Sequence, residues 1–250
     1  MKIFVINLAR STERRASIEH QLKQFNLDYE IFEAVDGAQL SYAEIMRDTK
    51  PLNYAISCGE IGCALSHIGI YKKIVAQNIP EALILEDDAL ITSQTADTLT
   101  WLSSLNISKP TVTLLTETTH YISKKLHVTN DDSHSVCSVL EAACSHGYVV
   151  NYEAAKQLID FLYPVWMVAD KWQALREYSV CDVVAVIPPV ITKTQHADKS
   201  TIGNNDAPAK WMEQKKDFMW SEIKKHRPFK VKLKRFLWAS FVYPFLKISK

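Results

Sequence analysis

Residues 82–88 read Ala-Leu-Ile-Leu-Glu-Asp-Asp, four apolar side chains followed without a break by three carboxylates. A short continuous apolar run is typical of a strand that is buried on both faces of a parallel sheet. In open α/β sheets, ligands bind just beyond the carboxyl ends of such strands. The run therefore predicts a buried strand and marks the edge of the sheet at which a ligand would bind.

The rest of the chain alternates strand and helix patterns around this run. Residues 3–8 are apolar and β-rich, residues 12–25 repeat apolar side chains at helical spacing, and residues 29–34 alternate like a strand. A second helix is expected from about residue 57 to residue 75. Further expected elements are strands at 111–115, 147–151 and 182–187, a hairpin within 118–140 and a helix at 152–162. This order predicts one α/β domain over residues 1–205, with a mixed sheet flanked by helices.

The charge of the chain is unevenly distributed. Residues 210–250 carry 12 Lys/Arg against three acidic residues, whereas residues 1–209 carry 17 basic and 25 acidic residues. We therefore treat residues 206–250 as a separate basic tail. Within it, residues 224–246 mix positive charge with aromatic side chains, which is typical of a segment that lies on an anionic membrane surface. The alternative is a helix that packs its aromatic stripe on the body.

Several classes of protein lack their usual signals. The body has no basic patch of the kind that binds nucleic acid, and no run of about 18 uncharged apolar residues is present. The N-terminus has too short an apolar run for a secretory signal, so we expect a cytoplasmic protein. The five cysteines include no C-x-x-C pair, and we interpret Cys58 and Cys63 as buried thiols rather than metal ligands. P-loop, dinucleotide-fingerprint and zinc-protease motifs are likewise absent from the sequence.

The acidic triplet itself predicts a cation site. Three consecutive carboxylates after a buried strand repel one another unless a positive charge lies among them. Mg²⁺ and Mn²⁺ take oxygen ligands from one or two carboxylates together with substrate phosphates. A solvated acidic loop is the alternative, but the apolar residues on both sides of the triplet favour the metal.

Four patches of the chain resemble the glycosyltransferases of family 25, which build bacterial lipooligosaccharide and include β-1,4-galactosyltransferases. They are VINL at 5–8 with S-x-E-R-R at 11–15, EIGCALSH at 60–67, LEDD at 85–88 after Pro80, and GYVV at 147–150 with Ala154 and Ala155. With weaker matches as far as residue 203, the resemblance extends over some four fifths of the chain. The chain departs from the family pattern at Cys144, Ser145 and His146, where a Gly-Thr pair is expected before Gly147.

The resemblance implies a GT-A-like, Rossmann-like fold, a nucleotide-sugar donor and a divalent cation, Mn²⁺ or Mg²⁺. Carried over by position, the metal motif is Glu86-Asp87-Asp88, with Asp88 as the direct metal ligand and Glu86 facing the ribose or the metal shell. His196 would complete the metal shell, by analogy with other GT-A enzymes, or lie on the surface. The cation would neutralise the charge that develops on the leaving nucleoside diphosphate.

Further candidates lie on the first two predicted helices. Arg14 and Arg15 would bind phosphate or stack near the base, unless they belong to a solvated helical face. Ser66 and His67 fall within a family patch and would line the substrate site, although a lone histidine on an apolar helix face is more often a core residue.

Transfer with inversion requires a carboxylate to deprotonate the acceptor hydroxyl. Asp170 is our first candidate for this general base and Glu117 is the second, each with a surface carboxylate as the alternative. Trp172, beside Asp170, would stack on a sugar face.

These observations predict an inverting, metal-dependent transferase that moves a hexose, galactose from UDP-galactose, onto a lipooligosaccharide or lipopolysaccharide acceptor. The acceptor would be lipid-linked and presented at the inner face of the bacterial inner membrane. A glucosyl- or other hexosyltransferase on the same scaffold is one alternative. A non-catalytic module that binds glycans or a lipid surface is the other, and the intact acidic triplet argues against it.

Overall fold

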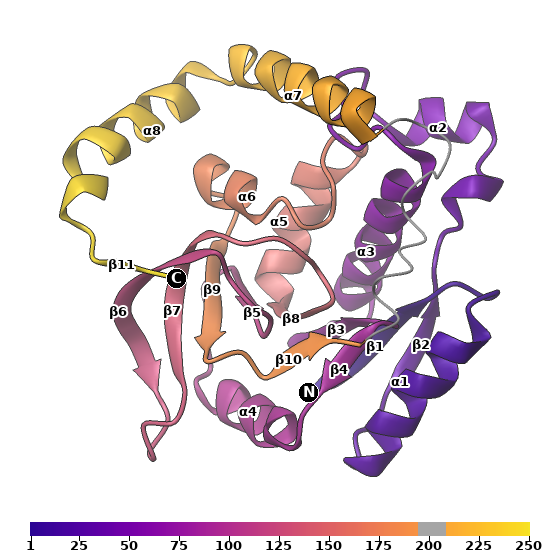
Figure 1. Cartoon of the computed structure of the whole chain (residues 1–250), viewed down its shortest axis with the longest axis vertical. Helices are drawn as coiled ribbons and strands as arrows, with labels where there is room; N and C mark the ends of the chain where they lie inside the picture. Colours follow the sequence, from indigo (N-terminus) through magenta and orange to yellow (C-terminus); the bar gives the residue numbers. More distant parts are fainter. Residues whose placement is uncertain (195–208) are drawn as a thin grey trace.

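A computed structural model of the 250-residue chain describes residues 1–194 and 209–250. Within these ranges the largest sheet has nine strands in the order β11-β6-β7-β9-β5-β8-β3-β1-β2 (Figure 1). Its strands are β1 (Lys2–Asn7), β2 (Glu30–Glu33), β3 (Glu81–Glu86), β5 (Thr111–Leu114), β6 (His120–Val128), β7 (Ser135–Glu141), β8 (Gly147–Asn151), β9 (Asp182–Ile187) and β11 (Ile248–Ser249). A separate two-stranded ladder pairs β4 (Ala89–Ile91) with β10 (Ile191–Lys193). The predicted mixed α/β sheet is confirmed, including the hairpin β6–β7.

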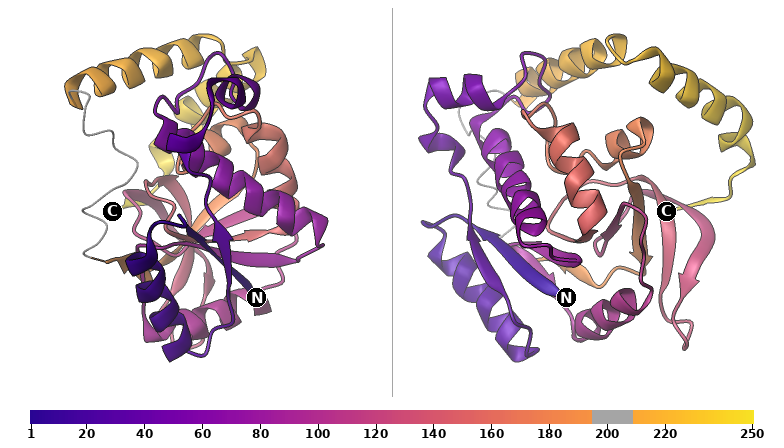
Figure 2. Two further views of the ribbon diagram at one scale, coloured as in Figure 1. Left: turned by 90° about the vertical axis from the view of Figure 1, so that its right-hand side faces the viewer. Right: turned by 180° about the vertical axis from the view of Figure 1, so that it is seen from behind.

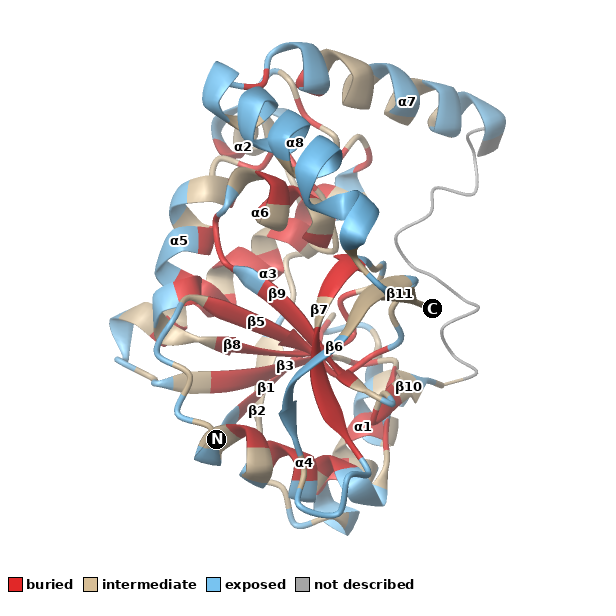
Figure 3. Cartoon of the chain, turned by 90° about the vertical axis from the view of Figure 1, so that its left-hand side faces the viewer, coloured by how far each residue is buried: buried red, intermediate tan, exposed pale blue. Residues whose placement is uncertain are grey.

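The predicted central strand lies where the sequence places it. β3 pairs in parallel with β1 on one side and antiparallel with β8 on the other. Residues 82–85 are fully buried (Figure 3). Since neighbouring side chains of a strand point to opposite faces, Ala82 and Ile84 belong to one core and Leu83 and Leu85 to the other.

Helices cover both faces of the sheet (Figure 2). One core packs against α3 (Cys58–Ala76), α5 (Tyr152–Leu162) and α6 (Trp172–Tyr178), and the other against α1 (Thr12–Gln24) and α4 (Ser93–Ser104). The sequence analysis left α4 unassigned, because Thr95, Thr98 and the other polar residues of this helix obscure its apolar face. α2 (Tyr42–Asp48) precedes α3.

Gly62 lets α3 approach the loop that follows β2. A Cβ at Gly62 would lie 2.6 Å from the carbonyl oxygen of Val35, and backbone cannot move aside cheaply. Alanine is the better helix former by about 1 kcal/mol, but overpacking costs about 1–3 kcal/mol. We expect Gly62→Ala to lower the free energy of unfolding in urea denaturation. Gly69→Ala, which meets only the Phe32 ring, is the matched control on the same helix and should have a smaller effect.

The basic tail forms α7 (Ala209–Lys225) and α8 (Phe229–Phe241), which arch over one end of the body, and it ends in β11 (Figures 1 and 2). Several contacts hold it to the body, and they include the following three. Ile223 is buried in the core, Arg227 lies 2.6 Å from Glu177 in a buried ion pair, and β11 pairs with β6. No helix in the described ranges combines the length and hydropathy needed to cross a membrane.

Candidate functional site

The site is built at the carboxyl ends of β1 and β3, which lie side by side because the two strands are parallel. Asp87 connects them. Its Oδ2 accepts a 2.7 Å hydrogen bond from Asn7 Nδ2, and its Oδ1 lies 3.1 Å from Arg14 Nη1. Burial raises the pKa of Asp87, although Asn7 and Arg14 oppose this effect. Asp87 and Arg14 thus join β3 to the start of α1.

Glu86 points away from Asp87, toward α3. Its Oε1 accepts a 2.5 Å hydrogen bond from Ser145 Oγ and lies 3.4 Å from His67 Nε2. Burial alone would raise the pKa of Glu86, but the facing His67 ring and the Ser145 hydroxyl outweigh it and lower the pKa to about 2. Glu86 is therefore an anion at neutral pH.

Of the three carboxylates, Asp88 is the one with a buried oxygen, Oδ1, that lacks a hydrogen-bond partner among the described residues. Burial, followed by the charge of Glu86, raises the pKa of Asp88 from its ordinary 3.8 to about 6. The backbone holds it in place, since the Asp88 carbonyl accepts a 2.9 Å hydrogen bond from the Thr194 amide. A buried carboxylate oxygen without a partner fits a cation ligand.

A cavity of about 260 Å³ opens over Glu86 and Asp88. Its lining combines carboxylates with two lysines: Glu60, Cys63, Glu86, Asp88, residues 144–146, residues 168–170, Lys193 and Lys216. The hydrogen bond with Cys144 raises the pKa of Lys193, and the charges of Asp88 and Glu86 add to this effect. Burial opposes the shift but does not cancel it. Lys216 forms an ion pair with Glu60. The volume suits a cation with a diphosphate better than a whole sugar nucleotide.

Sequence reasoning missed both lysines and Ser145. Lys193 lies in β10 and Lys216 in α7, far along the chain from residues 82–88. Nothing in their local pattern marks them, because a lysine in a basic helix or after a strand is ordinary on a surface. The one signal that would have pointed to Lys193 is its place shortly after the predicted strand at 182–187.

Asp170 also lines the cavity and holds the loop before β8. Its Oδ2 accepts a 2.9 Å hydrogen bond from the Cys144 amide. Cys144 has a φ of 72°, in the left-handed region, so the loop needs such support. Glu117, the other candidate base, is exposed and does not line this cavity.

The expectation that Trp172 stacks on a sugar is wrong. Trp172 is only 1% exposed, and its ring packs edge-on against Tyr148. Its Nε1 donates a 3.0 Å hydrogen bond to the Cys144 carbonyl. Trp172 supports the same loop as Asp170, from inside the core.

The α3 candidates separate into different environments. Ser66 is buried and bridges elements, since its Oγ donates to the Gly62 carbonyl and accepts from the Val35 amide. His67 is 1% exposed and faces Glu86 from behind the cavity. The expectation of a buried thiol is wrong for Cys58, which is exposed, whereas Cys63 is partly buried. Burial, and then Glu86, raises the pKa of the Cys63 thiol well above its ordinary value.

Arg15 does not line the cavity. Arg15 is half exposed, and its Nε lies 2.9 Å from Glu19 on the same helix. His196 falls outside the described residues. Arg14, Glu86, Asp87 and Asp88 are thus brought together at one strand end, and Asp170 lines the same cavity as Glu86 and Asp88.

A Rossmann-like sheet with carboxylates and lysines around a cavity at one strand end suits a phosphate-bearing ligand. Comparison with known proteins identifies the family. The model of glycosyltransferase family 25, described as an LPS biosynthesis protein family, matches residues 1–172. The chain belongs to glycosyltransferase family 25, as its resemblance predicted.

Curated relatives carry the family name or are named galactosyltransferases. A glycosyltransferase 25 family member of Aedes aegypti is 46% identical over 96 residues, which are 34% of this chain and 16% of the relative. Procollagen galactosyltransferase 2 of Homo sapiens is 29% identical over 176 residues, 63% of this chain and 27% of the relative. An inactive glycosyltransferase 25 family member 3 of Mus musculus is 31% identical over 96 residues, 35% of this chain and 16% of the relative. The matches thus span about a quarter or less of each relative. Together with the family match, they support a glycosyltransferase.

Proposed function

We propose that the chain is an active, inverting, metal-dependent glycosyltransferase that transfers galactose from UDP-galactose. The observation that carries this proposal is Asp88 at the carboxyl end of the central strand, whose Oδ1 is buried and has no hydrogen-bond partner among the described residues. Lys193 and Lys216 line the same cavity and supply charge for phosphate groups. The galactosyltransferase among the relatives supports galactose as the sugar.

The residues present fit a hard divalent cation. Asp88 offers an unpartnered carboxylate oxygen and Glu86 an ionised one, and oxygen ligands are what Mg²⁺ and Mn²⁺ prefer. When bound, the cation would neutralise the negative charge that develops on the departing diphosphate. His196, outside the described residues, stays a predicted third ligand.

The chain's own groups divide the remaining work. Lys193 and Lys216 would hold the diphosphate oxygens. Asp170, which lines the same cavity, would accept the proton of the acceptor hydroxyl as that oxygen attacks the anomeric carbon. Attack from the face opposite the leaving diphosphate inverts the anomeric configuration.

Donor hydrolysis tests this proposal. The protein is incubated with Mn²⁺ and a panel of UDP- and GDP-sugars, and the released nucleotide is measured. We expect UDP-galactose to be consumed fastest, and EDTA to stop the reaction until Mn²⁺ or Mg²⁺ is restored. Equal rates with and without EDTA would refute the metal dependence. Faster consumption of UDP-glucose would identify a glucosyltransferase on the same scaffold.

A non-catalytic module is the second candidate, because one relative is named inactive. That protein would bind a sugar nucleotide without consuming it. Measuring binding and hydrolysis on the same preparation separates the two functions.

We further propose that the acceptor is a lipooligosaccharide or lipopolysaccharide precursor at the inner face of a bacterial inner membrane, and that α8 lies on that membrane. No residue of α8 is buried, although Trp238 packs against Arg176 and is partly covered. Other apolar side chains of α8 and of the following turn are exposed: Phe229, Leu233, Phe236, Leu237, Phe241, Tyr243 and Phe245. Four lysines and arginines are interspersed among them, at 230, 232, 234 and 235. Aromatic rings beside basic residues suit the headgroup region of an anionic bilayer.

Vesicle sedimentation checks the membrane contact. We expect the double variant Phe236→Ser, Phe241→Ser to bind anionic vesicles at least about tenfold more weakly, because each buried ring contributes about 1.5–3 kcal/mol. Phe218→Ser is the matched control, since Phe218 is equally exposed on α7 but lies outside this patch. The proposal fails if wild-type protein ignores anionic vesicles at low salt, or if the control weakens binding as much.

A further inference from the structure

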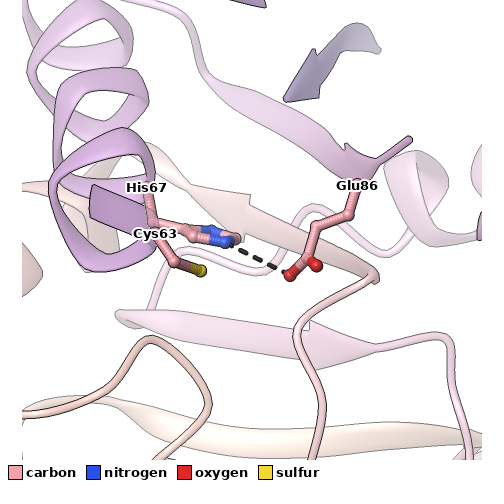
Figure 4. A group of neighbouring side chains, drawn as sticks. All are labelled: Cys63, His67 and Glu86. Atoms are coloured by element: carbon pink, nitrogen blue, oxygen red, sulfur yellow. Dashed lines mark ion pairs between the residues drawn. The ribbon is translucent and has the colours of Figure 1, made fainter. Parts of the chain in front are cut away.

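Three side chains converge at the first residue of the acidic triplet. Cys63 and His67 lie one turn apart on α3, and Glu86 faces them from the end of β3 (Figure 4). One ligand atom from each, the Cys63 sulfur, an imidazole nitrogen and a carboxylate oxygen, lies within 4.8 Å of the others. Spacing of four residues on a helix is what brings two side chains to one face.

His67 has a nitrogen that the protein does not satisfy. Its Nε2 is buried and makes no hydrogen bond with the described residues, although it lies 3.4 Å from Glu86 Oε1. That distance matches the ligand–ligand distance of a tetrahedral zinc site, in which ligands about 2.0–2.2 Å from the ion lie roughly 3.3–3.6 Å from one another. The nitrogen therefore points at the carboxylate with the spacing of two ligands of one ion.

The other ring nitrogen of His67, Nδ1, has a hydrogen-bond partner, as is usual for a histidine that binds a metal ion. Nδ1 lies 2.8 Å from the Tyr148 hydroxyl, which in turn lies 2.6 Å from the Tyr71 hydroxyl. With Nδ1–H donating to Tyr148, the lone pair of Nε2 is directed toward Glu86 and Cys63. A partner on the far nitrogen of this kind sets the tautomer and orientation of a histidine ligand.

We propose that Cys63, His67 and Glu86 form a binding site for a divalent transition-metal ion of the zinc type. This ion is a second one beside the hard cation proposed at Asp88, and Glu86 would bind it through Oε1, the oxygen that faces His67, leaving its other oxygen for the hard cation. A sulfur, a nitrogen and an oxygen donor together suit Zn²⁺, whereas Mg²⁺ and Mn²⁺ prefer oxygen alone. Binding displaces the thiol proton of Cys63, which leaves to solvent as the sulfur–metal bond forms.

The surroundings leave room for a fourth ligand. Cys63 and Glu86 both line the cavity, so an ion between them has one side open to water. The ion would also link α3 to β3. Because it binds only the folded chain, it would raise the temperature of unfolding.

Cobalt is the probe for this site, because a thiolate bound to Co²⁺ gives a ligand-to-metal charge-transfer absorption that oxygen ligands do not give. We expect one equivalent of Co²⁺ to produce this absorption in the wild-type protein without any sugar nucleotide, and Zn²⁺ to displace it. Cys63→Ser should abolish the absorption. Cys144→Ser is the matched control, since Cys144 lines the same cavity but does not belong to the cluster of Cys63, His67 and Glu86, and it should leave the absorption unchanged.

Two further variants separate this site from its neighbours. Tyr148→Phe removes only the hydroxyl behind His67 and should weaken Co²⁺ binding about 10- to 100-fold. Asp88→Asn should leave the absorption intact while impairing the hard-cation site. Absence of the absorption in folded wild-type protein, or its persistence in Cys63→Ser, would overturn the proposal. Since the readout involves no transfer reaction, its failure is independent of the proposed function.

Discussion

Replacing Asp88 by asparagine is expected to lower the rate of sugar transfer about a hundred- to a thousandfold, measured as product formed from UDP-galactose at saturating Mn²⁺. Removal of one group that stabilises developing charge has this magnitude in other enzymes. Asp88 would be such a group, because its carboxylate would hold the cation that neutralises the leaving diphosphate. Near-normal turnover in Asp88→Asn would remove this residue from the mechanism.

The same substitution should stabilise the protein in the absence of divalent cations. The pKa of Asp88 is raised from 3.8 to about 6 in the folded state, so the folded chain binds this proton more tightly than the unfolded chain. Its contribution to stability is therefore present below pH 4 and is lost as the pH rises through 6. At pH 7 we expect Asp88→Asn to melt at a higher temperature than wild type, and the difference to shrink toward pH 4.

Asp87→Asn is the informative neighbour. Asp87 holds Asn7 and Arg14 rather than lining the cavity, so its carboxylate positions the junction of β1, α1 and β3. Burial raises the pKa of Asp87 as well, so the two aspartates are compared by their transfer rates rather than by stability. At saturating Mn²⁺ we expect Asp87→Asn to retain more transfer than Asp88→Asn, because Asp87 does not face the cavity.

Local pattern was sufficient to predict the centre of the fold. The apolar run at residues 82–85 predicted β3, and its acidic end predicted the place of the cavity, because burial on both faces and an abrupt change to charge are properties of consecutive residues. The same reasoning failed for α4, whose buried threonines read as polar. Periodicity is a weak guide where polar side chains are buried by tertiary contacts.

The composition of the site depended on contacts that no local pattern contains. Asp87 and Asp88 are identical in sequence terms, yet one is paired with Arg14 and the other has no partner for its Oδ1 among the described residues. Lys193 reaches the cavity only because β10 pairs with β4, directly after the acidic triplet. Trp172 resembles a sugar-stacking residue by its position in the sequence, but its side chain is buried in the core. Roles of this kind are decided by long-range packing.

The second large effect is expected for Asp170→Asn. The hydrogen bonds of Asp170 allow this substitution to remove the base without removing the contact that supports the loop. Asp170 Oδ2 accepts a hydrogen bond from the Cys144 amide, while Asp170 Oδ1 accepts none from the described residues. In Asp170→Asn the amide oxygen can keep the bond to Cys144, and the NH₂ group replaces the oxygen that would take the acceptor proton. The loop should therefore survive while the base is lost.

We expect Asp170→Asn to lower the transfer rate about 10²- to 10⁴-fold, the usual contribution of a general base, with little change in the affinity for UDP-galactose. Calorimetric titration of the donor and a transfer assay on the same preparation measure the two quantities. Glu117→Gln is the control, because Glu117 is exposed and away from this cavity, and it should transfer at the wild-type rate. If instead Glu117→Gln loses transfer and Asp170→Asn retains it, Asp170 only supports the loop at Cys144, and the proton leaves by a carboxylate that lies outside this cavity.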